Sequence, residues 1–381
     1  MRLLIFSNAP WAPTGYGQQT AQLTRRLVRD GHTVAIAANF GLMGTTLSWE
    51  GVPVLPGGYD KYSADILPHH AADFEADWII TLYDAWVLPD LSAFRTACWV
   101  PVDHQPVPPA VTAHLKGVLP LAMSRFGQAE LAHMGINARY VPHAIEPAYH
   151  PSPSEFRRLI DIPPDAFLVM VNGANIGNMP ARKAWWEMLS GFKIFANTHP
   201  DAYLYLHTDP THPGGVDIAY MVRLLELVDR GRVVPQYPYR TGGISPERMA
   251  EAYTAADVLL ASSMGEGFGI PVIESQACGT PVIVTDFSAQ PELVGAGWKV
   301  GWQPWLDGPQ ASVLALPSIA SIAKALGQAY EARGTLSESA ITFAAQYDAD
   351  TVYATHWRPV LAEMAAKLVK QQSKRKKRKR R

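Results

Sequence analysis

The sequence predicts an α/β protein built from two doubly wound domains, each with a mainly parallel sheet covered by helices on both faces. At 381 residues, the chain is long for one domain and sufficient for two. Short apolar runs of strand length alternate with helical stretches, which is typical of parallel sheets. Glycine-rich turns follow two of these runs, and doubly wound sheets bind ligands at such turns. We therefore expect two Rossmann-like domains with ligand-binding loops at their strand ends.

The composition is that of an ordinary soluble enzyme. Hydrophobic residues make up 48% and charged residues 18%, and no apolar run is long enough to span a bilayer. The N-terminal apolar run stops at polar Ser7 and Asn8, which indicates a first strand and not a secretory signal. The two cysteines, Cys98 and Cys278, fall in different predicted domains, so no disulfide framework is expected. These features predict a cytoplasmic protein.

The C-terminus carries a separate electrostatic feature. Residues 374–381 are eight consecutive basic residues, and without them 25 basic and 34 acidic residues leave a net charge of −9. Because like charges repel one another, residues 371–381 are expected to form a disordered tail. The tail is either simply solvated or recruits a polyanion, with nucleic acid as the first candidate and anionic lipid as the second.

The first domain begins with a strand at residues 3–6, a helix at 18–30 and a strand at 33–38. The loop between the first strand and the helix, NAPWAPTGYG, carries Gly15 and Gly17 ahead of the helix. Glycines there let the backbone approach a ligand, although any strand-to-helix turn can carry them. Gly15 and Gly17 are therefore candidate ligand-binding residues.

Polar residues follow two later strands of this domain. Asp84 follows a strand-like run at 78–83, and Asp103 with His104 follows another at 98–102. Because ligands gather at the carboxyl ends of parallel strands, Asp84 and Asp103 are candidate ligand-binding residues. His104 is a candidate catalytic residue, although a lone histidine is more often structural.

A linker separates the two predicted domains. A strand at 118–123 and a helix at 124–134 complete the first domain, and the proline-rich residues 147–153 follow. The second domain then opens with a strand at 167–173.

Two adjacent cations end the next loop, ANIGNMPARK. Arg182 and Lys183 open a helix whose apolar positions include Trp186, Leu189 and Phe192. Two cations beside a diphosphate stabilise the negative charge that develops on it. Arg182 can equally be a solvated charge at the start of a helix.

Residues 262–292 are the stretch around which the chain is organised. They follow an apolar strand at 257–261, and Gly265, Gly267 and Gly269 alternate with other residues in the turn. A helix begins next, and its unpaired N–H groups and positive dipole suit a phosphate. The segment therefore predicts a site for an anionic ligand.

Two carboxylates flank this turn. Glu266 lies in the loop and Glu274 on the helix, with seven residues between them. They are too far apart to share a proton, so we expect them to recognise hydroxyl groups. Glycine turns and first-turn glutamates also occur in sheets with no such ligand.

The whole string from Glu266 to Val282, Glu-Gly-Phe-Gly-Ile-Pro-x-x-Glu-x-x-Ala-x-Gly-x-Pro-Val, closely resembles the nucleotide-sugar signature of family 4-type glycosyltransferases of the GT-B fold. The resemblance implies two Rossmann-like domains facing across a cleft, an acceptor-side domain at 1–147 and a nucleotide-sugar domain at 154–348. It also implies a last helix, at 349–370, that packs back on the first domain.

The resemblance further implies roles for the candidate residues. The donor diphosphate is expected to be held by Arg182, Lys183 and the backbone N–H groups of Gly267, Phe268 and Gly269. Glu274 is expected to bind the ribose, Glu266 the sugar, and His104 the sugar or the acceptor. In the first domain, Gly15 and Gly17 are expected to bind the donor, and Asp84 and Asp103 to lie on the acceptor side. Family members carry an arginine five positions before the lysine, where this chain has Asn178. Lys183 is therefore the stronger of the two cation candidates.

The expected reaction is a transfer, with retention of configuration, from a nucleoside-diphosphate sugar to a hydroxyl group. UDP-hexose is the first donor candidate and GDP-mannose the second. The acceptor is a modified base in DNA or, alternatively, a protein or a cell-surface glycan or lipid. No cofactor or metal is expected, because Asp348 and Asp350 lie at a helix start where capping explains them.

Two hypotheses from other functional classes remain open. One is a subunit that binds a nucleotide-sugar without turning it over, which the intact carboxylates and Lys183 disfavour. The other is an NAD-linked oxidoreductase, which is disfavoured because no Gly-x-Gly-x-x-Gly follows the first strand.

Overall fold

The computed structural model describes residues 1–91, 93–153, 155–177, 179–335 and 337–379, with the backbone alone for residues 371–379. These residues form two compact units. The first combines Met1–Val102, Val107–Ala144 and Ala349–Arg381, and the second combines Asp103–Pro106 and Ile145–Asp348.

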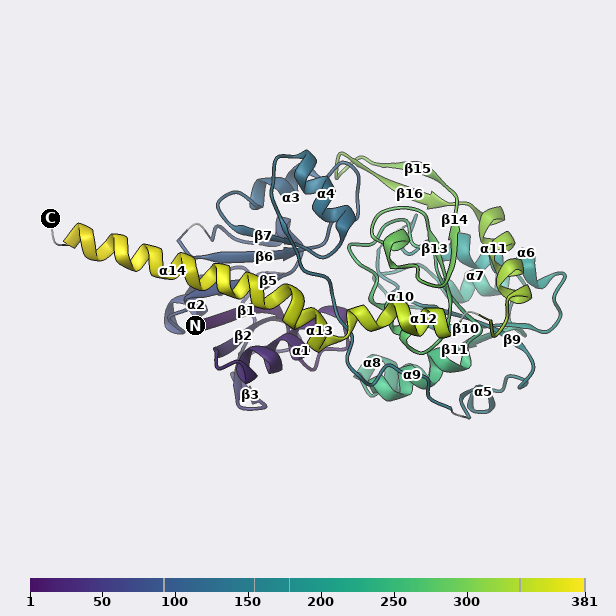
Figure 1. The fold of residues 1–381 in the computed structure, drawn as a ribbon. Helices are drawn as coiled ribbons and strands as arrows, with labels where there is room; N and C mark the ends of the chain where they lie inside the picture. Colours follow the sequence, from purple (N-terminus) through teal and green to yellow (C-terminus); the bar gives the residue numbers. More distant parts are fainter. Residues whose placement is uncertain (92, 154, 178, 336, 380–381) are drawn as a thin grey trace. The chain divides into compact units, whose positions relative to one another are not determined.

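The first unit is organised around strand β1 (Arg2–Asn8). Its residues 3–6 are almost fully buried because β1 lies inside an eight-stranded sheet. The strand order is β3-β4-β2-β1-β5-β6-β7-β8 (Figure 1), and every neighbouring pair is parallel except β3 with β4. The chain builds the sheet outward from β1 first on the β2 side and then on the β5 side. The topological switch of this sheet therefore lies between β1 and β5.

The other elements of the first unit follow in chain order. They are α1 (Gly15–Arg29), β2 (Thr33–Phe40), β3 (Leu47–Trp49), β4 (Val52–Leu55), α2 (Leu67–Asp73), β5 (Trp78–Leu82), the short helix η1 (Ala85–Val87), β6 (Thr96–Val100), α3 (Pro109–His114), β7 (Leu119–Ala122), α4 (Arg125–His133), β8 (Arg139–Tyr140), α13 (Ala349–Val352), the π-helix η4 (Tyr353–Trp357) and α14 (Arg358–Lys379).

The second unit is a six-stranded, fully parallel sheet with the order β11-β10-β9-β12-β13-β14. Residues Phe167, Val169 and Val171 of β9 face a core that they share with α6, α7 and α11. The alternate residues Leu168 and Met170 are equally buried and face the opposite side of the sheet. A strand that is buried on both faces is a continuous apolar run in the sequence. This is why the sequence predicted β9. The switch of this sheet lies between β9 and β12.

The elements of the second unit also follow in chain order. They are α5 (Phe156–Leu159), β9 (Phe167–Asn172), α6 (Trp185–Ala196), β10 (Ala202–His207), α7 (Ile218–Leu224), β11 (Gly231–Val233), α8 (Gln236–Thr241), α9 (Pro246–Ala255), β12 (Val258–Ala261), α10 (Ile270–Ala277), β13 (Val282–Thr285), η2 (Gln290–Leu293), β14 (Gly297–Val300), β15 (Trp302–Asp307), β16 (Ser312–Pro317), α11 (Ile319–Glu331), α12 (Ser337–Ala344) and η3 (Ala345–Tyr347).

Strands β15 and β16 form an antiparallel hairpin, and the segment Asp103–Pro106 adds to it. Gln105 and Val313 exchange two backbone hydrogen bonds, at 3.1 and 3.0 Å. The structure therefore groups Asp103 and His104 with the second unit, which corrects the sequence boundaries that placed them in the first domain. Side-chain patterns do not reveal such an addition, because a hairpin edge pairs with another strand through backbone groups.

The end of the chain packs within the first unit. Asp350 accepts hydrogen bonds from Arg26 at 3.1 Å and from Arg29 at 2.7 Å. The ring of Trp357 meets that of Trp99 edge-on, with centroids 5.0 Å apart. Asp350 is thus an ion-pair residue, whereas the sequence suggested only a helix cap.

Helix α14 continues through most of the basic block. The backbone of residues 371–379 is helical, where the sequence predicted a disordered tail. Lysine, arginine and glutamine are strong helix formers, and the preceding turns around buried Met364 are already packed, so the helix needs no new nucleation. Arg380 and Arg381 lie outside the described residues.

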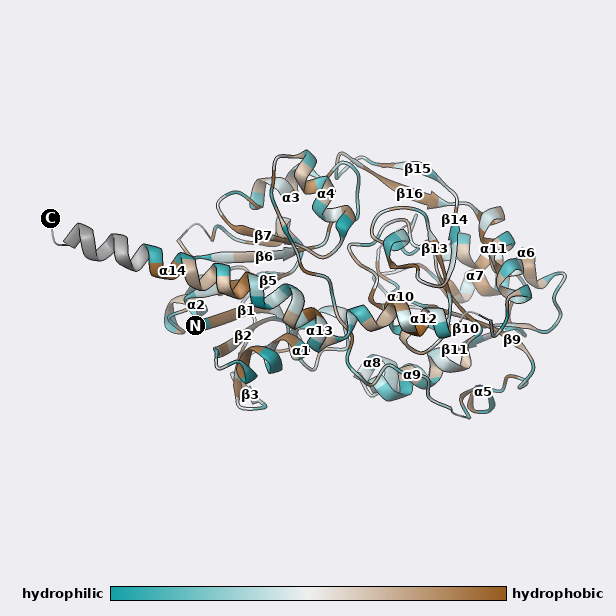
Figure 2. Ribbon diagram, in the orientation of Figure 1, coloured by the Kyte–Doolittle hydropathy of each residue, from teal (hydrophilic) through white to brown (hydrophobic). Residues whose placement is uncertain are grey.

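Hydropathy follows the layers of each unit. Figure 2 shows strand β1 as hydrophobic along much of its length, whereas polar colours concentrate on helix surfaces and loops. Among the described helices, none is both long and apolar enough to cross a membrane.

Candidate functional site

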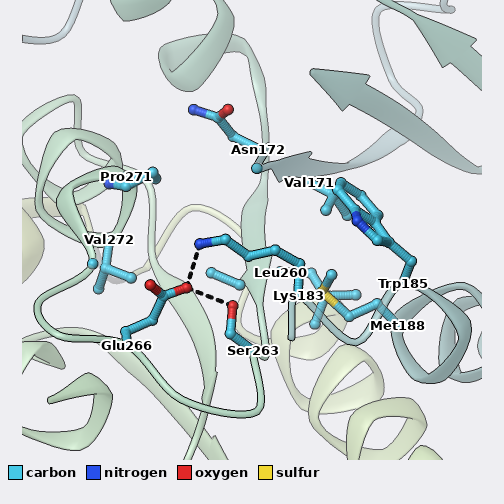
Figure 3. A pocket seen from close by; sticks show the side chains of 13 residues that line it. Val171, Asn172, Lys183, Trp185, Met188, Leu260, Ser263, Glu266, Pro271 and Val272 are labelled. Carbon is cyan, nitrogen blue, oxygen red and sulfur yellow. Dashed lines mark hydrogen bonds and ion pairs between the residues drawn. The ribbon is translucent and has the colours of Figure 1, made fainter. Parts of the chain in front are cut away.

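The second unit carries a pocket at its topological switch, where the neighbouring strands β9 and β12 end. Doubly wound sheets bind ligands at this point, because successive connections leave the sheet on opposite sides and open a crevice. Helices α6 and α10 contribute residues from their first turns. The pocket, seen in Figure 3, is lined by Val171, Asn172, Gly173, Lys183, Trp185, Met188, Leu260, Ala261, Ser263, Glu266, Gly269, Pro271 and Val272.

Glu266 is the charged centre of this pocket. Its Oε1 atom accepts hydrogen bonds from the Lys183 ammonium and, at 2.7 Å, from the Ser263 hydroxyl (Figure 3). Its Oε2 atom accepts a hydrogen bond from Arg182 Nη1 at 3.0 Å. Arg182 also donates to the carbonyl oxygen of Gly265. The structure therefore brings both predicted cations onto one predicted carboxylate.

The loop before α6 holds the two cations in place. The N–H of Met264, in the turn after β12, donates to the carbonyl oxygen of Arg182 at 2.7 Å. Ala184, the N-cap of α6, has a left-handed backbone with φ of 50°. This conformation costs a non-glycine residue about 1 kcal/mol or more, so the surrounding packing must hold it. The side chain of Lys183 is less exposed than that of Arg182, at 20% against 40%.

The charges around Glu266 decide its ionisation. Burial disfavours the ionised form, but the charges of Lys183 and Arg182 outweigh burial and lower the pKa of Glu266 to about 2. Burial is also the largest effect on Lys183 and lowers its pKa, even though Glu266 opposes that shift. At neutral pH Glu266 is thus a carboxylate, which Lys183 and Arg182 contact directly.

Helix α10 begins at the edge of the pocket. Its N-cap, Gly269, has φ of +115°, a conformation that is strained for any residue with a Cβ. Pro271 occupies the first turn, where the missing N–H costs nothing. Gly267, Phe268 and Gly269 form the turn into the helix, and the side chain of Phe268 is buried. The start of α10 therefore lines the same pocket as Glu266.

Glu274, on the same helix, is buried in a chain of polar side chains. The Tyr253 hydroxyl donates to Glu274 Oε2 at 2.7 Å, and the Asn172 amide donates to the Tyr253 hydroxyl at 2.7 Å. Burial raises the pKa of Glu274, although hydrogen bonds from Tyr253 and Tyr149 act in the opposite direction. Asn172 also lines the pocket, so this network connects Glu274 to it.

His104 is bonded through both of its ring nitrogens. Nδ1 lies 2.6 Å from Asp103 Oδ1, and Nε2 lies 3.2 Å from Asp307 Oδ2 of the hairpin. Burial lowers the pKa of His104, but the two carboxylates outweigh burial and raise it. Asp103 Oδ2 also lies 3.7 Å from Arg182 Nη1. Asp103 and His104 therefore lie beside the pair of cations, Arg182 and Lys183. The ring thus contacts two carboxylates, and its contact with a sugar or acceptor stays a prediction.

The remaining candidates lie in the first unit. Gly15 and Gly17 belong to the first turn of α1, and not to a loop ahead of it, because the Thr14 side chain caps the helix by accepting from the Gly17 N–H at 3.0 Å. Packing requires glycine at 17, since a Cβ there would lie 2.4 Å from the carbonyl oxygen of Ala12. Asp84 follows β5 and precedes η1. These three residues are not part of the cluster that the second unit builds around Glu266.

Sequence reasoning missed three residues of the site. Ser263 had a detectable signal, because it is a polar residue at a strand end three positions before Glu266. Asp307 and Tyr253 had none, because their partners His104 and Glu274 lie 203 and 21 residues away in the chain.

Two expectations concern other positions. Asn178, which holds the arginine position of the family pattern, lies outside the described residues. Within the part of the chain that the structure describes, no group of three or more His, Cys, Asp or Glu side chains is placed to hold a metal ion.

Comparison with known proteins reveals a shared segment. Residues 240–330 match the family model of glycosyl transferases group 1. D-inositol 3-phosphate glycosyltransferase from Rhodococcus erythropolis is 39% identical over 74 residues, which cover 19% of this chain and 16% of that protein. Mannosylfructose-phosphate synthase from Agrobacterium fabrum is 28% identical over 110 residues, covering 29% of this chain and 24% of that protein. The matched segments thus span less than a quarter of these relatives.

Solved structures match over nearly the whole chain. Sucrose-phosphate synthase from Thermosynechococcus elongatus has a TM-score of 0.76 at 17% identity, covering 96% of this chain and 100% of that chain. HepE from Anabaena, solved in complex with UDP-glucose, has a TM-score of 0.69 at 14% identity, covering 95% and 100%. These likenesses confirm the predicted GT-B fold of two Rossmann-like domains. The chain therefore has the fold of the GT-B glycosyltransferases, and its residues 240–330 are similar to the glycosyl transferases of group 1.

Proposed function

We propose that this protein transfers a sugar from a nucleoside-diphosphate sugar to an acceptor hydroxyl and releases the nucleoside diphosphate. The observation that carries the proposal is the convergence of Lys183 and Arg182 on Glu266, next to the start of helix α10. Cationic side chains and helix N-termini are the groups that proteins use to bind phosphates. Here they meet at the switch of a parallel sheet.

The cations act on the leaving group. As the bond between the sugar and the phosphate breaks, negative charge grows on the diphosphate, and preorganised cations and N–H groups stabilise it. Without a donor, Lys183 and Arg182 neutralise Glu266. When the diphosphate binds, we infer that the cations turn to its oxygens and leave the Glu266 carboxylate to orient the hydroxyls of the sugar.

Glu274 is the proposed ribose ligand. The hydrogen bond from Tyr253 holds the carboxyl group in a defined orientation, which we infer suits a diol. The raised pKa of Glu274 matters less than this geometry, because a carboxyl group accepts hydrogen bonds from hydroxyls in either protonation state.

The finer features of the reaction are also proposals. UDP-hexose is the preferred donor, and the HepE complexes with UDP and UDP-glucose are consistent with that choice. GDP-mannose is the second candidate. We infer that configuration at the anomeric carbon is retained, with the departing phosphate receiving the proton of the acceptor, so no side-chain base is needed. No metal or cofactor is required, because the side chains supply the positive charge.

Two acceptor classes follow from different features. The basic block at residues 374–381 favours a polyanion, such as DNA carrying a hydroxyl on a modified base, which would have to leave the base stack to react. A protein, glycan or lipid hydroxyl is the alternative and makes no use of the block. A non-catalytic subunit that only binds the nucleotide-sugar is the second candidate function.

The test is to incubate the full-length protein with UDP-, GDP- and ADP-sugars and to measure the release of nucleoside diphosphate, with and without acceptors. A transferase releases nucleoside diphosphate from one donor, and Lys183→Ala loses that activity. Added EDTA is expected to leave the rate unchanged, whereas a rate restored by Mg²⁺ or Mn²⁺ would contradict the metal-free mechanism. Tight donor binding without turnover would support the non-catalytic subunit.

A further inference from the structure

Five charged side chains of the second unit form a row of alternating sign. Arg182 Nη1 lies 3.0 Å from Glu266 Oε2 and 3.7 Å from Asp103 Oδ2. His104 Nδ1 lies 2.6 Å from Asp103 Oδ1, and His104 Nε2 lies 3.2 Å from Asp307 Oδ2. We call Glu266, Arg182, Asp103, His104 and Asp307 the charge row. It connects the lining of the pocket to the end of strand β15.

Backbone contacts hold the segments of the charge row together. The N–H of Ala315, in β16, donates to the carbonyl oxygen of Met264 in the turn that carries Glu266, at 2.9 Å. In the same turn, a Cβ at Gly265 would lie 2.4 Å from the carbonyl oxygen of Asp103, so this position requires glycine. The carboxylates of the row are therefore carried by segments whose backbones lie against one another.

His104 is positively charged in this arrangement. An ionised carboxylate only accepts hydrogen bonds, so each ring nitrogen of His104 must carry a proton and donate it. Burial lowers the pKa of His104, but Asp103 and Asp307 outweigh burial and raise it. Burial also opposes the ionisation of Asp103, yet the hydrogen bond from His104 and the charge of Arg182 lower the pKa of Asp103. His104 and Arg182 therefore share the neutralisation of Asp103.

Arg182 lies between two carboxylates, Glu266 and Asp103, and 40% of its side chain is exposed. A cation in this position is accessible to a diphosphate, but it must give up part of its present contacts to bind one. If His104 loses its proton, Arg182 is the remaining ion-pair partner of Asp103 among the residues that the structure describes. Because attraction between charges is strong in a shielded site, Asp103 then holds Arg182 more firmly.

We propose that Asp307 is a positioning residue that keeps His104 charged, so that His104 neutralises Asp103 and Arg182 is available to the donor diphosphate. Asp307 acts through its neighbours and need not touch the donor. The proposal rests on the transferase function above and adds a dependence of donor affinity on pH. Affinity is high while His104 is charged, and it falls as pH rises and the ring loses its proton.

The first measurement is the pKa of His104 in the full-length protein, by NMR titration of ¹³C-labelled histidine assigned with His104→Gln. We expect Asp307→Asn to lower this pKa by about one unit or more, because it removes a charge that favours the imidazolium. Asp307→Glu restores a carboxylate and should recover much of the shift. Asp286→Asn is the matched control, because Asp286 is exposed and its carbonyl oxygen accepts a hydrogen bond from Trp302 of the same hairpin at 2.8 Å.

The second measurement is the Kd for UDP, or for GDP if UDP does not bind, by calorimetry from about pH 5 to pH 9. We expect wild type to lose about tenfold in affinity as His104 loses its proton, and Asp307→Asn to show the same loss at lower pH. The pH dependence that comes from the nucleotide, Lys183 and Glu266 is common to these proteins. His104→Gln retains that common dependence and should lack the additional step.

The outcomes separate the charge row from the transferase function. An unchanged titration of His104 in Asp307→Asn would overturn the role of Asp307. A shifted titration with an unshifted Kd profile, or a step that persists in Arg182→Ala, would overturn the connection from His104 to Arg182. Absence of binding by both nucleotides would overturn the diphosphate site and the proposal with it. Binding without donor turnover would overturn the transferase function alone, because both measurements still test Asp307.

Discussion

The hydroxyl of Tyr253, on α9, donates a hydrogen bond to Glu274 Oε2, on α10, at 2.7 Å. Both residues are buried, and the Asn172 amide donates to the same hydroxyl at 2.7 Å from the end of β9. Three elements of the second unit are therefore joined at the carboxylate that we propose binds the donor ribose. The orientation of this carboxylate depends on a residue that the donor need not touch.

Tyr253→Phe removes this hydrogen bond and keeps the ring. Loss of one hydrogen bond, about 0.5–1.5 kcal/mol, predicts a rise of about two- to twelvefold in the KM for the donor and a smaller change in kcat. Steady-state kinetics with a donor that lacks the ribose 2′- and 3′-hydroxyls should abolish the difference from wild type. Tyr237→Phe, at a position 81% exposed, is the control. An equal effect on both donors would mean that Tyr253 is merely structural.

Glu274→Ala removes the proposed ribose ligand itself. Loss of hydrogen bonds to a buried diol costs a few kcal/mol, so kcat/KM for the donor should fall on the order of 10²-fold. Circular dichroism and thermal unfolding establish that the variant is folded. Glu274→Gln keeps the size of the side chain and removes its charge, so it checks whether donor binding needs the carboxylate. Near-wild-type turnover in folded Glu274→Ala protein would remove Glu274 from the donor site.

Lys183→Ala is expected to lower turnover more than Arg182→Ala. Both cations contact Glu266, but Lys183 lines the pocket and is the less exposed of the two. Interactions with charge in a shielded site are stronger than those near solvent. The comparison uses kcat for nucleoside-diphosphate release from the preferred donor. The reverse order would assign the main diphosphate contact to Arg182.

The imidazole of His104 should make stability depend on pH. Although burial opposes it, Asp103 and Asp307 raise the pKa of His104 above the ordinary 6.5. A raised pKa in the folded state stabilises the protein below pH 6.5, and this contribution is lost as pH rises through the folded-state value. The difference in unfolding temperature between wild type and His104→Gln should therefore shrink between pH 6 and pH 9. A constant difference would show that the ring contributes only as a neutral group.

Deletion of residues 374–381 tests the basic block. If DNA is the acceptor, truncated protein should bind duplex DNA more weakly, with a shallower salt dependence, and should show a higher KM for the polymer. Donor hydrolysis serves as the internal reference. Identical salt-dependent binding by the full-length and truncated proteins would leave the block without a role in acceptor choice and would favour a protein or glycan acceptor.

Several parts of the fold could be predicted because their signals are local. The strand β9 (Phe167–Asn172) was predicted at 167–173, within one residue, since a strand buried on both faces is a continuous apolar run. Helix α1 was placed three residues too late, because the capping hydroxyl of Thr14 recruits Gly15 and Gly17 into the first turn. The basic block was predicted to be disordered from its charge, whereas helix propensity carries α14 through to Lys379.

The sequence by itself determined the chemistry of the candidate donor site. The glycine turn, Glu266, Glu274 and the adjacent cations all lie on strand ends and helix starts that short-range patterns identify. Only the tertiary structure decided which of these groups meet: Lys183 and Arg182 on Glu266, Tyr253 on Glu274, and His104 between Asp103 and Asp307. The physical reason is that such contacts depend on backbone pairing and on packing between distant segments. Neither backbone pairing nor packing between distant segments produces a periodic pattern in the sequence.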